Sequence, residues 1–398
     1  MQIRRERFKV NELKVQLIEW RHYLHAHPEC AFEEAGTAAF VAETLRSMGI
    51  EVETGIGKTG VVGTLKVGNG ERVVGLRADM DCICLQETSN LPYASQTPNR
   101  MHACGHDGHT ATLLGAPKIL SERKDFSGTV RFVFQPAEEP GRGSRAMIED
   151  GLFERFPMDE MYGLHNMPQY PAGTIAVREG GIQASEDNFI ITLKGKGGHA
   201  SAPEIVKDPL VTAAEIICAL QTIVSRNVTP TETAVISCTE IESDGAHNAI
   251  PSNVIIRGDT RSFTPEMSQL IEKRMEAICK HICEMNGLEC EFTYTHEFAP
   301  TFNWKDNVQY VVKAAKAVVG EEHVIENCAP DNGLRGFWAL YTECAGLLCN
   351  FWEAKEMEKR RFHFTILVLI IMMIFGNRGR VFCRTCERKA GKSINKRG

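Results

Sequence analysis

An eight-residue segment concentrates side chains that can bind metal ions. From His102 to His109 it reads His-Ala-Cys-Gly-His-Asp-Gly-His, with one thiol, three imidazoles and one carboxylate. A Cys and a His two positions apart, such as Cys104 and His106, can converge on one ion from an irregular segment, and they suit zinc, manganese, cobalt or nickel. The alternative is a solvated polar loop, but few structural roles require this combination. We therefore expect a metal site here.

Two further groups of polar residues follow apolar segments that are expected to be strands. Glu138 and Glu139 come after the run 129–135, and His165 follows the short apolar segment 161–164. Ligands bind in open α/β sheets at the carboxyl ends of strands, so one carboxylate could bind metal while the other acts as a base. Alone, each signal also fits an ordinary turn or loop. Together with the first cluster they predict a metal-hydrolase site, in which the ion polarises a carbonyl and activates water.

The elements that must position these residues alternate between helices and strands. Periodicity in the first half predicts helices at 34–48 and 109–120 and strands at 61–67, 73–78 and 129–135. This alternation predicts an α/β domain with a mainly parallel sheet.

A different pattern follows between residues 184 and 297. Its predicted order is strand, helix, strand, strand, helix, strand, which is typical of a ferredoxin-like α+β sandwich. Helical periodicity resumes at 307–319, so we expect the small domain to be inserted into the large one. The predicted divisions are a catalytic domain at 1–183, the inserted domain at 184–297, a return segment at 298–332 and an atypical tail at 333–398.

Composition, net charge and the two ends of the chain exclude several classes of protein. The 398 residues are 43% hydrophobic, enough for two buried cores, and the formal net charge of -6 comes without a basic stripe, which argues against a nucleic-acid partner. The charged segment 1–10 does not resemble a secretion signal, so we expect a cytoplasmic protein. Its 14 irregularly spaced cysteines are then expected to be reduced. The apolar run 364–375 is shorter than the roughly 20 residues of a membrane span, so no membrane partner is expected.

The motifs together resemble a known family. With Arg77-Ala-Asp-Met-Asp81 upstream and Gly195-Lys-Gly-Gly-His199 downstream, the chain resembles the M20 metallopeptidases over roughly residues 15 to 330. The nearest branch looks like the hippurate hydrolases, N-acyl-amino-acid amidohydrolases and indole-acetyl-amino-acid hydrolases. The resemblance implies a two-metal site with Glu138 as general base, Cys104 as the bridging ligand, and the metal ligands Cys104, His106, Glu139 and His165.

The same resemblance implies roles outside the ligand set. The inserted domain would serve as a lid and as a homodimerisation surface, and His199 would help to polarise the carbonyl of a small N-acyl amino acid substrate. Asn248 and Arg261 look suited to binding the substrate carboxylate, although a turn Asn and a surface Arg are the alternatives. Asp79 and Asp81 could orient a ligand imidazole, with strand-end capping as the alternative.

The C-terminal part departs from the family. The family continues with Ser-Glu-Asp-Phe and later Leu-His-Asn-Pro motifs, whose His completes the metal site, and neither motif occurs here. The codons of Met372, Met373 and Ile374 must be ATG-ATG-ATH. Read from the third nucleotide, this sequence becomes GAT-GAT, which encodes two aspartates. With permitted codons, 361–374 then reads Ile-Pro-Leu-His-Asn-Pro-Ser-Phe-Asp-Tyr-Asn-Asp-Asp, and the opposite shift makes 336–352 family-like. We therefore hypothesise that the written C-terminus is out of frame.

This hypothesis leaves three interpretations open. The leading one is a metal-dependent amidohydrolase acting on N-acyl amino acids, with one of its two metal positions incomplete because the last ligand is missing. His363 is the only histidine of the tail and could substitute for that ligand. The alternatives are a dipeptidase or aminoacylase of the same mechanism, and a catalytically impaired or dead member of the family.

Overall fold

The chain divides into two compact units. The computed structural model describes residues 2–171, 173–330 and 345–351. Among these, the large unit comprises the chain up to Val177, Trp304–Cys328 and 345–351, and the small unit comprises Arg178–Asn303 and 329–330. The small unit contains the range 184–297 that the sequence pattern marks as a separate domain. The chain thus passes from the large unit into the small one and returns.

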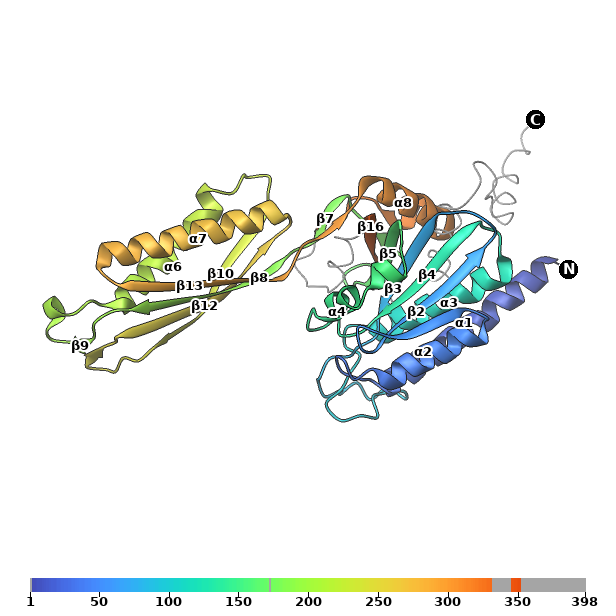
Figure 1. Cartoon of the computed structure of the whole chain (residues 1–398), viewed down its shortest axis with the longest axis horizontal. Coiled ribbons are helices and arrows are strands. Elements are labelled where there is room, and N and C mark those ends of the chain that lie inside the picture. The colour runs from blue at the N-terminus through green and yellow to red at the C-terminus, as the bar shows by residue number, and fades with distance from the viewer. Residues whose placement is uncertain (1, 172, 331–344, 352–398) are drawn as a thin grey trace, which may run out of the picture. The chain divides into compact units, whose positions relative to one another are not determined.

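Eight strands of the described chain form the sheet of the large unit (Figure 1). Their order across the sheet is β1 (Glu51–Ile56), β2 (Gly60–Val67), β4 (Gly128–Gln135), β3 (Val73–Asp79), β5 (Glu160–Asn166), β16 (Ala345–Phe351), β6 (Ile175–Ala176) and β15 (Val324–Ile325). The sheet is mixed, with four parallel and three antiparallel pairs of neighbouring strands, so the prediction of a mainly parallel sheet is not confirmed. Strands β4, β3, β5 and β16 run parallel, whereas β1, β2 and β4 are antiparallel neighbours. The short turn between β1 and β2 allows only an antiparallel pair, because parallel strands need a longer crossover.

Three helices of the large unit pack on one face of this sheet and enclose the main core. The helices of the large unit are α1 (Gln2–Ala26), α2 (Ala35–Ser47), α3 (His106–Arg123), α4 (Gly143–Glu149), α5 (Leu152–Arg155) and α8 (Lys305–Val319). Residues of α2, α3 and α8 share one buried cluster with alternate residues of β2, β3, β4 and β5. Alternation places those residues on a single face. The buried central strands are therefore held rigidly where their carboxyl ends meet.

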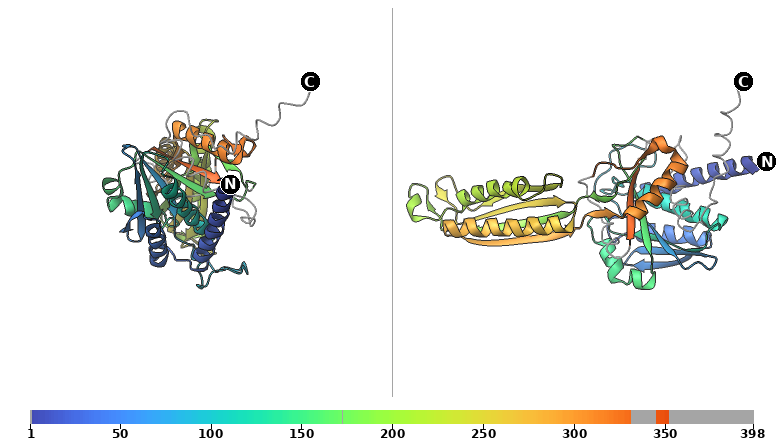
Figure 2. Two further views of the ribbon diagram at one scale, coloured as in Figure 1. Left: turned by 90° about the vertical axis from the view of Figure 1, so that its right-hand side faces the viewer. Right: turned by 90° about the horizontal axis from the view of Figure 1, so that it is seen from above.

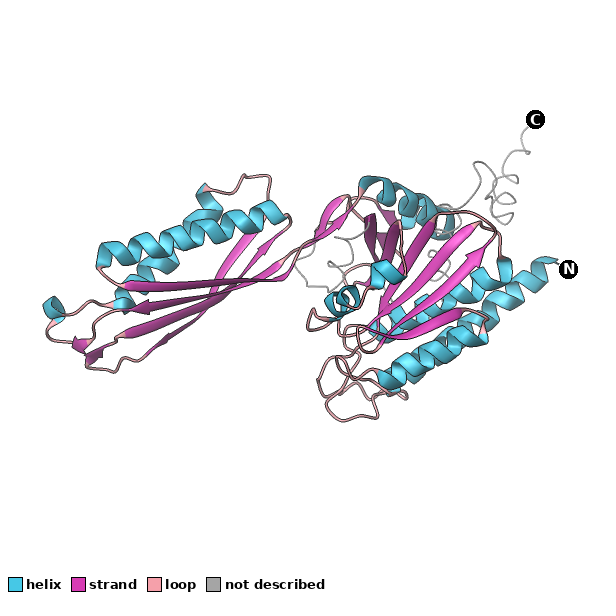
Figure 3. Ribbon diagram, in the orientation of Figure 1, coloured by secondary structure: helices cyan, strands magenta, loops and turns pink. Residues whose placement is uncertain are grey.

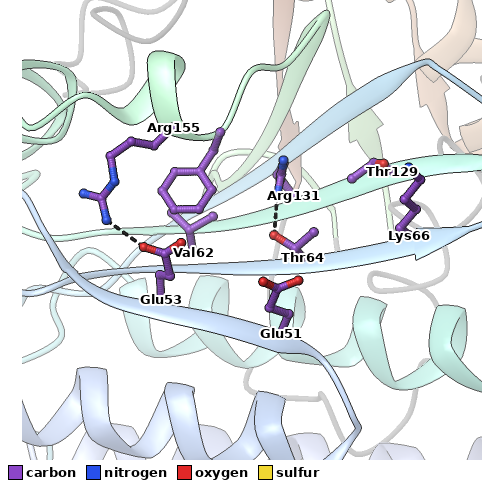
Figure 4. A pocket seen from close by; sticks show the side chains of 9 residues that line it. Glu51, Glu53, Val62, Thr64, Lys66, Thr129, Arg131 and Arg155 are labelled. Carbon is purple, nitrogen blue, oxygen red and sulfur yellow. Dashed lines mark hydrogen bonds and ion pairs between the residues drawn. The ribbon is translucent and has the colours of Figure 1, made fainter.

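The opposite face of β1, β2 and β4 is polar. A hollow of about 380 Å³ lies there, lined by Glu51, Glu53, Val62, Thr64, Lys66, Thr129, Arg131, Arg155 and Phe156. Figure 4 shows Arg155 directed at Glu53 and Arg131 at Thr64, and both pairs are hydrogen-bonded. These charges belong to the solvent-facing side of the sheet, and none of the predicted site residues lines the hollow.

The small unit is a four-stranded antiparallel sheet with two helices on one face (Figures 2 and 3). Its elements follow the predicted order: β8 (Glu186–Lys194), α6 (Pro209–Arg226), β10 (Ala234–Ser243), β12 (Asn253–Ser262), α7 (Pro265–Asn286) and β13 (Glu289–Phe298). Both helices begin with proline after a capping residue. Asp208 accepts hydrogen bonds from the first turn of α6, and Thr264 does so for α7. Short strands complete the unit: β7 (Gly180–Gln183), β9 (Gly198–His199), β11 (Ala249–Ile250) and β14 (Thr301–Asn303).

One disulfide departs from the expectation of reduced cysteines. Cys30 and Cys84 are bonded, with their Cα atoms 6.2 Å apart, and no other disulfide forms within the described residues. The two cysteines meet because the segment before α2 runs beside the residues after β3, where Cys82 N donates to Glu29 O (2.8 Å). This contact joins segments about 50 residues apart, so cysteine spacing alone could not reveal it.

Two sequence predictions concern membrane contact and the tail. Among the described residues, α6 is the one helix whose length and composition would allow it to cross a membrane. Its buried residues pack in the core of the small unit. The apolar run 364–375 and the two segments used for the frame hypothesis, apart from 345–351 in β16, lie outside the described residues.

Candidate metal centre

Three neighbouring parallel strands bring the candidate ligands together. Strand β3 lies between β4 and β5, and all three run in the same direction. The carboxyl ends of parallel strands meet at one edge of the sheet, where ligands bind in open α/β folds. The structure accordingly assembles these predicted residues at that edge: Asp79, Asp81, Cys104, His106, Glu138, Glu139 and His165.

His106 lies at the centre of this group. It is the first residue of α3, and its Nδ1 donates to the backbone carbonyl of Asp81 (2.8 Å). Its other ring nitrogen, Nε2, lies 3.7 Å from carboxylate oxygens of both Glu138 and Glu139. Burial opposes a charge on the ring, but the Asp79 carboxylate and the hydrogen bonds to Asp81 and Cys104 together outweigh it, so the pKa of His106 is raised well above its usual value. The field that stabilises a proton there would also attract a metal cation.

Cys104 and His165 form a second side of the site. The Sγ of Cys104 lies 3.7 Å from Nε2 of His165. His165 donates from Nδ1 to the backbone carbonyl of Asn166 (2.7 Å), which fixes the ring with Nε2 toward the thiol. A histidine ligand commonly donates its second ring N–H in this way.

The two glutamates come from the turn after β4. The backbone N–H of Glu139 donates to Oδ2 of Asp81 (3.0 Å), so Asp81 holds the turn as well as His106. Burial raises the pKa of Glu138, and burial together with neighbouring carboxylates raises the pKa of Glu139 to about 7. Such carboxylates are poised to hold a proton or, when deprotonated, a cation.

Asp79 is a buried carboxylate of the site that contacts both Arg77 and His109. It is fully buried, pairs with Nη1 of Arg77 (2.7 Å) and accepts from Nδ1 of His109 (2.7 Å). Burial favours its neutral form, but the charges of His106 and Arg77 prevail and hold the pKa of Asp79 well below its usual value. His109 also contacts Oδ1 of Asn166 (2.5 Å). His109 belongs to the cluster found in the sequence, but spacing alone does not show which of its histidines would face a metal ion.

The donor set fits divalent cations. Three overlapping groups have ligand atoms within 4.8 Å of one another: Cys104, His106 and His165; Asp79, His106 and His109; and His106, Glu138 and Glu139. Nε2 of His106 and Oε1 of Glu139 are buried without a hydrogen-bond partner in the described part of the chain. Leaving such groups unsatisfied is costly, and a cation between them would remove that cost.

The three remaining candidates lie in the small unit. His199 is exposed on β9, and its Nδ1 is 2.7 Å from Oγ of Ser201. Asn248 lies beside it, since its carbonyl accepts from Ala200 N (3.0 Å). Arg261 on β12 is ion-paired, with Nη2 2.9 Å from Glu186 and Nε 2.7 Å from Asp259. A guanidinium already held by two carboxylates is less available to a substrate anion, so its predicted role stays a prediction.

The comparisons with known proteins agree with this donor set. Residues 75–333 match the family described as peptidase family M20/M25/M40. The chain is 42% identical over 339 residues to the hippurate hydrolase of Campylobacter jejuni, covering 85% of this chain and 88% of that protein. It is 41% identical over 300 residues to the N-acyl-L-amino acid amidohydrolase of Geobacillus stearothermophilus, covering 75% and 80%.

A solved structure extends the comparison. The YXEP protein of Bacillus subtilis, described as a dinuclear metal binding peptidase from the M20 family, superposes with a TM-score of 0.79. The sequences are 29% identical, and the alignment covers 92% of this chain and 99% of that one. Sequence, fold and donor set agree, and the chain belongs to the M20 peptidase family of metal-dependent hydrolases.

Proposed function

We propose that the chain hydrolyses the amide bond of N-acyl amino acids with the help of two divalent cations. The cations would be held by Cys104, His106, Glu139 and His165. The observation that carries this proposal is the buried convergence of His106 Nε2 and the carboxylates of Glu138 and Glu139, each 3.7 Å away. Relatives that hydrolyse hippurate and N-acyl-L-amino acids support the substrate class.

Glu138 is the proposed general base. Its side chain is buried, and burial raises its pKa toward the range in which a carboxylate can both accept and return a proton. It would take the proton of the attacking water and later deliver it to the leaving amine. The bound cations would supply Lewis acidity, polarising the scissile carbonyl and lowering the pKa of water. The mixed sulfur, nitrogen and oxygen donors suit zinc, manganese, cobalt or nickel.

One of the two metal positions is proposed to be incomplete in the chain as written. The family match ends at residue 333, where the atypical tail begins, and the tail lacks the motif that supplies the last histidine. This favours a catalytically impaired product as the second candidate function. Resequencing the coding DNA from about Asn327 to the stop codon tests it: a frame that restores Leu-His-Asn-Pro removes the second candidate, and the written frame supports it.

The small unit is proposed to act as lid and homodimer surface. His199 would polarise the substrate carbonyl, and Asn248 and Arg261 would bind the substrate carboxylate. Strand β10 lies at an edge of the sheet and is exposed along its second half, which leaves backbone groups available to another copy. We also propose a cytoplasmic enzyme with neither nucleic acid nor membrane as a partner. Sedimentation of the purified chain tests the dimer, and a monomer at micromolar concentration would contradict it.

Metal content and substrate screening test the activity itself. A frame-corrected chain should hold close to two ions, whereas the chain as written should hold about one. Turnover should be highest on N-acetyl or N-benzoyl amino acids and lower on unblocked dipeptides. Preference for dipeptides would favour the dipeptidase alternative, and absence of both bound metal and turnover in the corrected chain would refute the proposal.

A further inference from the structure

We propose that Glu34 is a positioning residue that fixes the turn carrying Glu138 and Glu139. Glu34 immediately precedes α2, far from these glutamates in the sequence, and its side chain is fully buried. The roles of the two glutamates rest on the proposed function. The claim that Glu34 fixes the turn rests on hydrogen bonds alone.

The carboxylate of Glu34 joins three separate segments. Its Oε1 accepts from the backbone N–H of Phe32 (2.9 Å) and from that of Ala137 (2.8 Å). Its Oε2 accepts from Oγ1 of Thr59 (2.5 Å), in the turn between β1 and β2. Every one of these partners is a donor, so a single buried acceptor ties the start of α2, a hairpin turn and the turn after β4 together.

The turn after β4 needs such support. Ala137 is buried and has φ of +45°, a left-handed conformation that residues other than glycine rarely adopt. Its carbonyl accepts from Gly143 N (2.9 Å), and a Cβ at Gly143 would lie 1.6 Å from the carbonyl oxygen of Pro136. The chain is therefore closely packed on this side and cannot easily adopt another path.

The hydrogen bonds flank Glu138 on both sides. Glu34 holds the N–H of Ala137, just before Glu138, and Asp81 holds the N–H of Glu139, just after it. Small displacements of reacting groups reduce catalysis strongly. Without Glu34, a buried N–H would lose its partner, and the turn could relax away from the conformation that directs both glutamates at His106.

Helix capping does not explain Glu34. The first turn of α2 is capped by Glu29, whose carboxylate accepts from Gly36 N (3.0 Å) and Thr37 N (2.7 Å). Glu34 makes no side-chain cap hydrogen bond to the helix. Glu29 is therefore a matched control: a carboxylate of the same segment that stabilises α2 without contacting the turn after β4.

Hydrogen–deuterium exchange of the full chain tests the inference independently of activity. Three variants are compared with the unmodified chain: Glu34→Met, Glu34→Gln and Glu29→Met. In Glu34→Met the peptide covering 134–142 should exchange at least about tenfold faster, because the protecting acceptor is gone. Glu34→Gln keeps an acceptor and should exchange like the unmodified chain. Glu29→Met should accelerate exchange at the start of α2 only.

Equal exchange of the 134–142 peptide in Glu34→Met and Glu29→Met would overturn the inference. If Glu34→Met does not fold, Glu34→Asp replaces it, because a side chain one methylene shorter keeps the charge but cannot span to Ala137. The same faster exchange is then expected, and its absence overturns the inference equally.

A second measurement connects the turn to the metal centre. Titration with Co²⁺, followed by visible absorption, should show affinity about 10- to 100-fold weaker in Glu34→Met than in Glu29→Met, as is typical when support of a ligand is lost. In a frame-corrected chain, kcat should fall by a similar factor with KM within about twofold, and Glu34→Gln should restore both. Faster exchange of the turn without these changes would refute the roles proposed for the glutamates while leaving Glu34 as the residue that fixes the turn.

Discussion

Two buried polar clusters, one in each unit, differ in how completely their atoms are paired. In the small unit, Asp187 is buried and accepts from Oγ of Ser268 (2.8 Å), the hydroxyl of Tyr294 (3.1 Å) and Nδ1 of His296 (3.0 Å). In the metal centre, Nε2 of His106 faces carboxylates at 3.6 to 3.7 Å and has no hydrogen bond within the described residues. The first cluster is held by hydrogen bonds, whereas in the second Nε2 of His106 faces the carboxylates at ion-pair distances.

The contrast between the two clusters shows which kind of buried polar group indicates a ligand site. Buried charged groups that converge without hydrogen-bonding to one another carry a desolvation cost that a bound cation can reduce. Absence of a partner alone is weaker evidence, as His102 shows: both its ring nitrogens are buried without a hydrogen bond in the described structure. Burial lowers the pKa of His102 to about 4, so this ring is neutral at neutral pH and less costly to leave unpaired.

The sharpest way to test the comparison is to remove the proposed base. In a frame-corrected chain, Glu138→Gln should lower kcat by about 10²- to 10⁴-fold, because the amide cannot accept the proton of water. The bound metal should remain, since Glu139 and the other proposed ligands are intact. Steady-state kinetics and metal analysis measure both, with the exposed Glu149→Gln as control. Unchanged turnover would remove Glu138 from the role of base.

Removing a proposed ligand should affect the metal first. Cys104→Ala should weaken Co²⁺ affinity by more than about 100-fold, beyond the 10- to 100-fold typical of residues that only support ligands. The absorption band that arises from thiolate coordination should disappear at the same time. Cys218→Ala replaces an exposed cysteine of the small unit and should change neither quantity. An unaltered spectrum in Cys104→Ala would exclude the thiol from the metal site.

Disrupting the hydrogen-bonded cluster around Asp187 in the small unit should lower the stability of the fold and leave the metal affinity unchanged. Asp187→Ala leaves the buried hydroxyl of Ser268 and the half-buried hydroxyl of Tyr294 without this acceptor, and each unsatisfied buried group costs about 1–3 kcal/mol. We therefore expect a loss of about 3 kcal/mol in the free energy of unfolding, measured in urea, with Co²⁺ affinity of the folded chain unchanged. Glu204→Ala, at an exposed position, should cost less than about 0.5 kcal/mol. A change in metal affinity in Asp187→Ala would contradict the separation of the two clusters.

The comparison also explains what the sequence could predict. Cys104 and His106 lie close together just before a predicted helix, and Glu139 and His165 follow apolar runs, so local pattern sufficed to single these residues out. The family resemblance was needed to give them roles. Membership of the family is confirmed, and the roles stay predictions. The mainly parallel sheet is not confirmed for the whole sheet, because the strand pattern of 61–67 does not show the direction of its neighbour, which the hairpin with β1 sets.

Contacts between segments far apart in the chain could not be predicted from the sequence. Glu34 and Ala137 are 103 positions apart, and Cys30 and Cys84 are 54 apart; neither pair has a spacing rule that links it. The left-handed conformation of Ala137 was equally hidden, since alanine is not the residue that favours it. Residues that support a site are recruited by packing, whereas residues that bind a ligand are marked by their chemistry.

A third buried cluster, around His25, is expected to give the smallest of these effects, a change in stability with pH. His25 is buried, with Nδ1 2.8 Å from Oδ2 of Asp107 and Nε2 3.2 Å from Oε1 of Glu87. Burial lowers its pKa, but the hydrogen bonds and charges of both carboxylates prevail, so the pKa of His25 is raised above 6.5. The folded protein then binds this proton more tightly than the unfolded chain does. The resulting stabilisation is fully present below about pH 6.5 and is lost as the pH rises through the raised value.

We expect the urea midpoint to fall between pH 6 and pH 9 by more in the unmodified chain than in His25→Gln. The effect should be smaller than that of Asp187→Ala, because the neutral ring keeps one N–H and therefore one of its two hydrogen bonds to the carboxylates. His281→Gln changes an exposed histidine and should keep the slope of the unmodified chain. Parallel slopes for the unmodified chain and His25→Gln would show that His25 gains no proton affinity on folding. His25 would then resemble His102, whose buried ring is neutral. It would not resemble the ion-paired histidine that contacts Asp187.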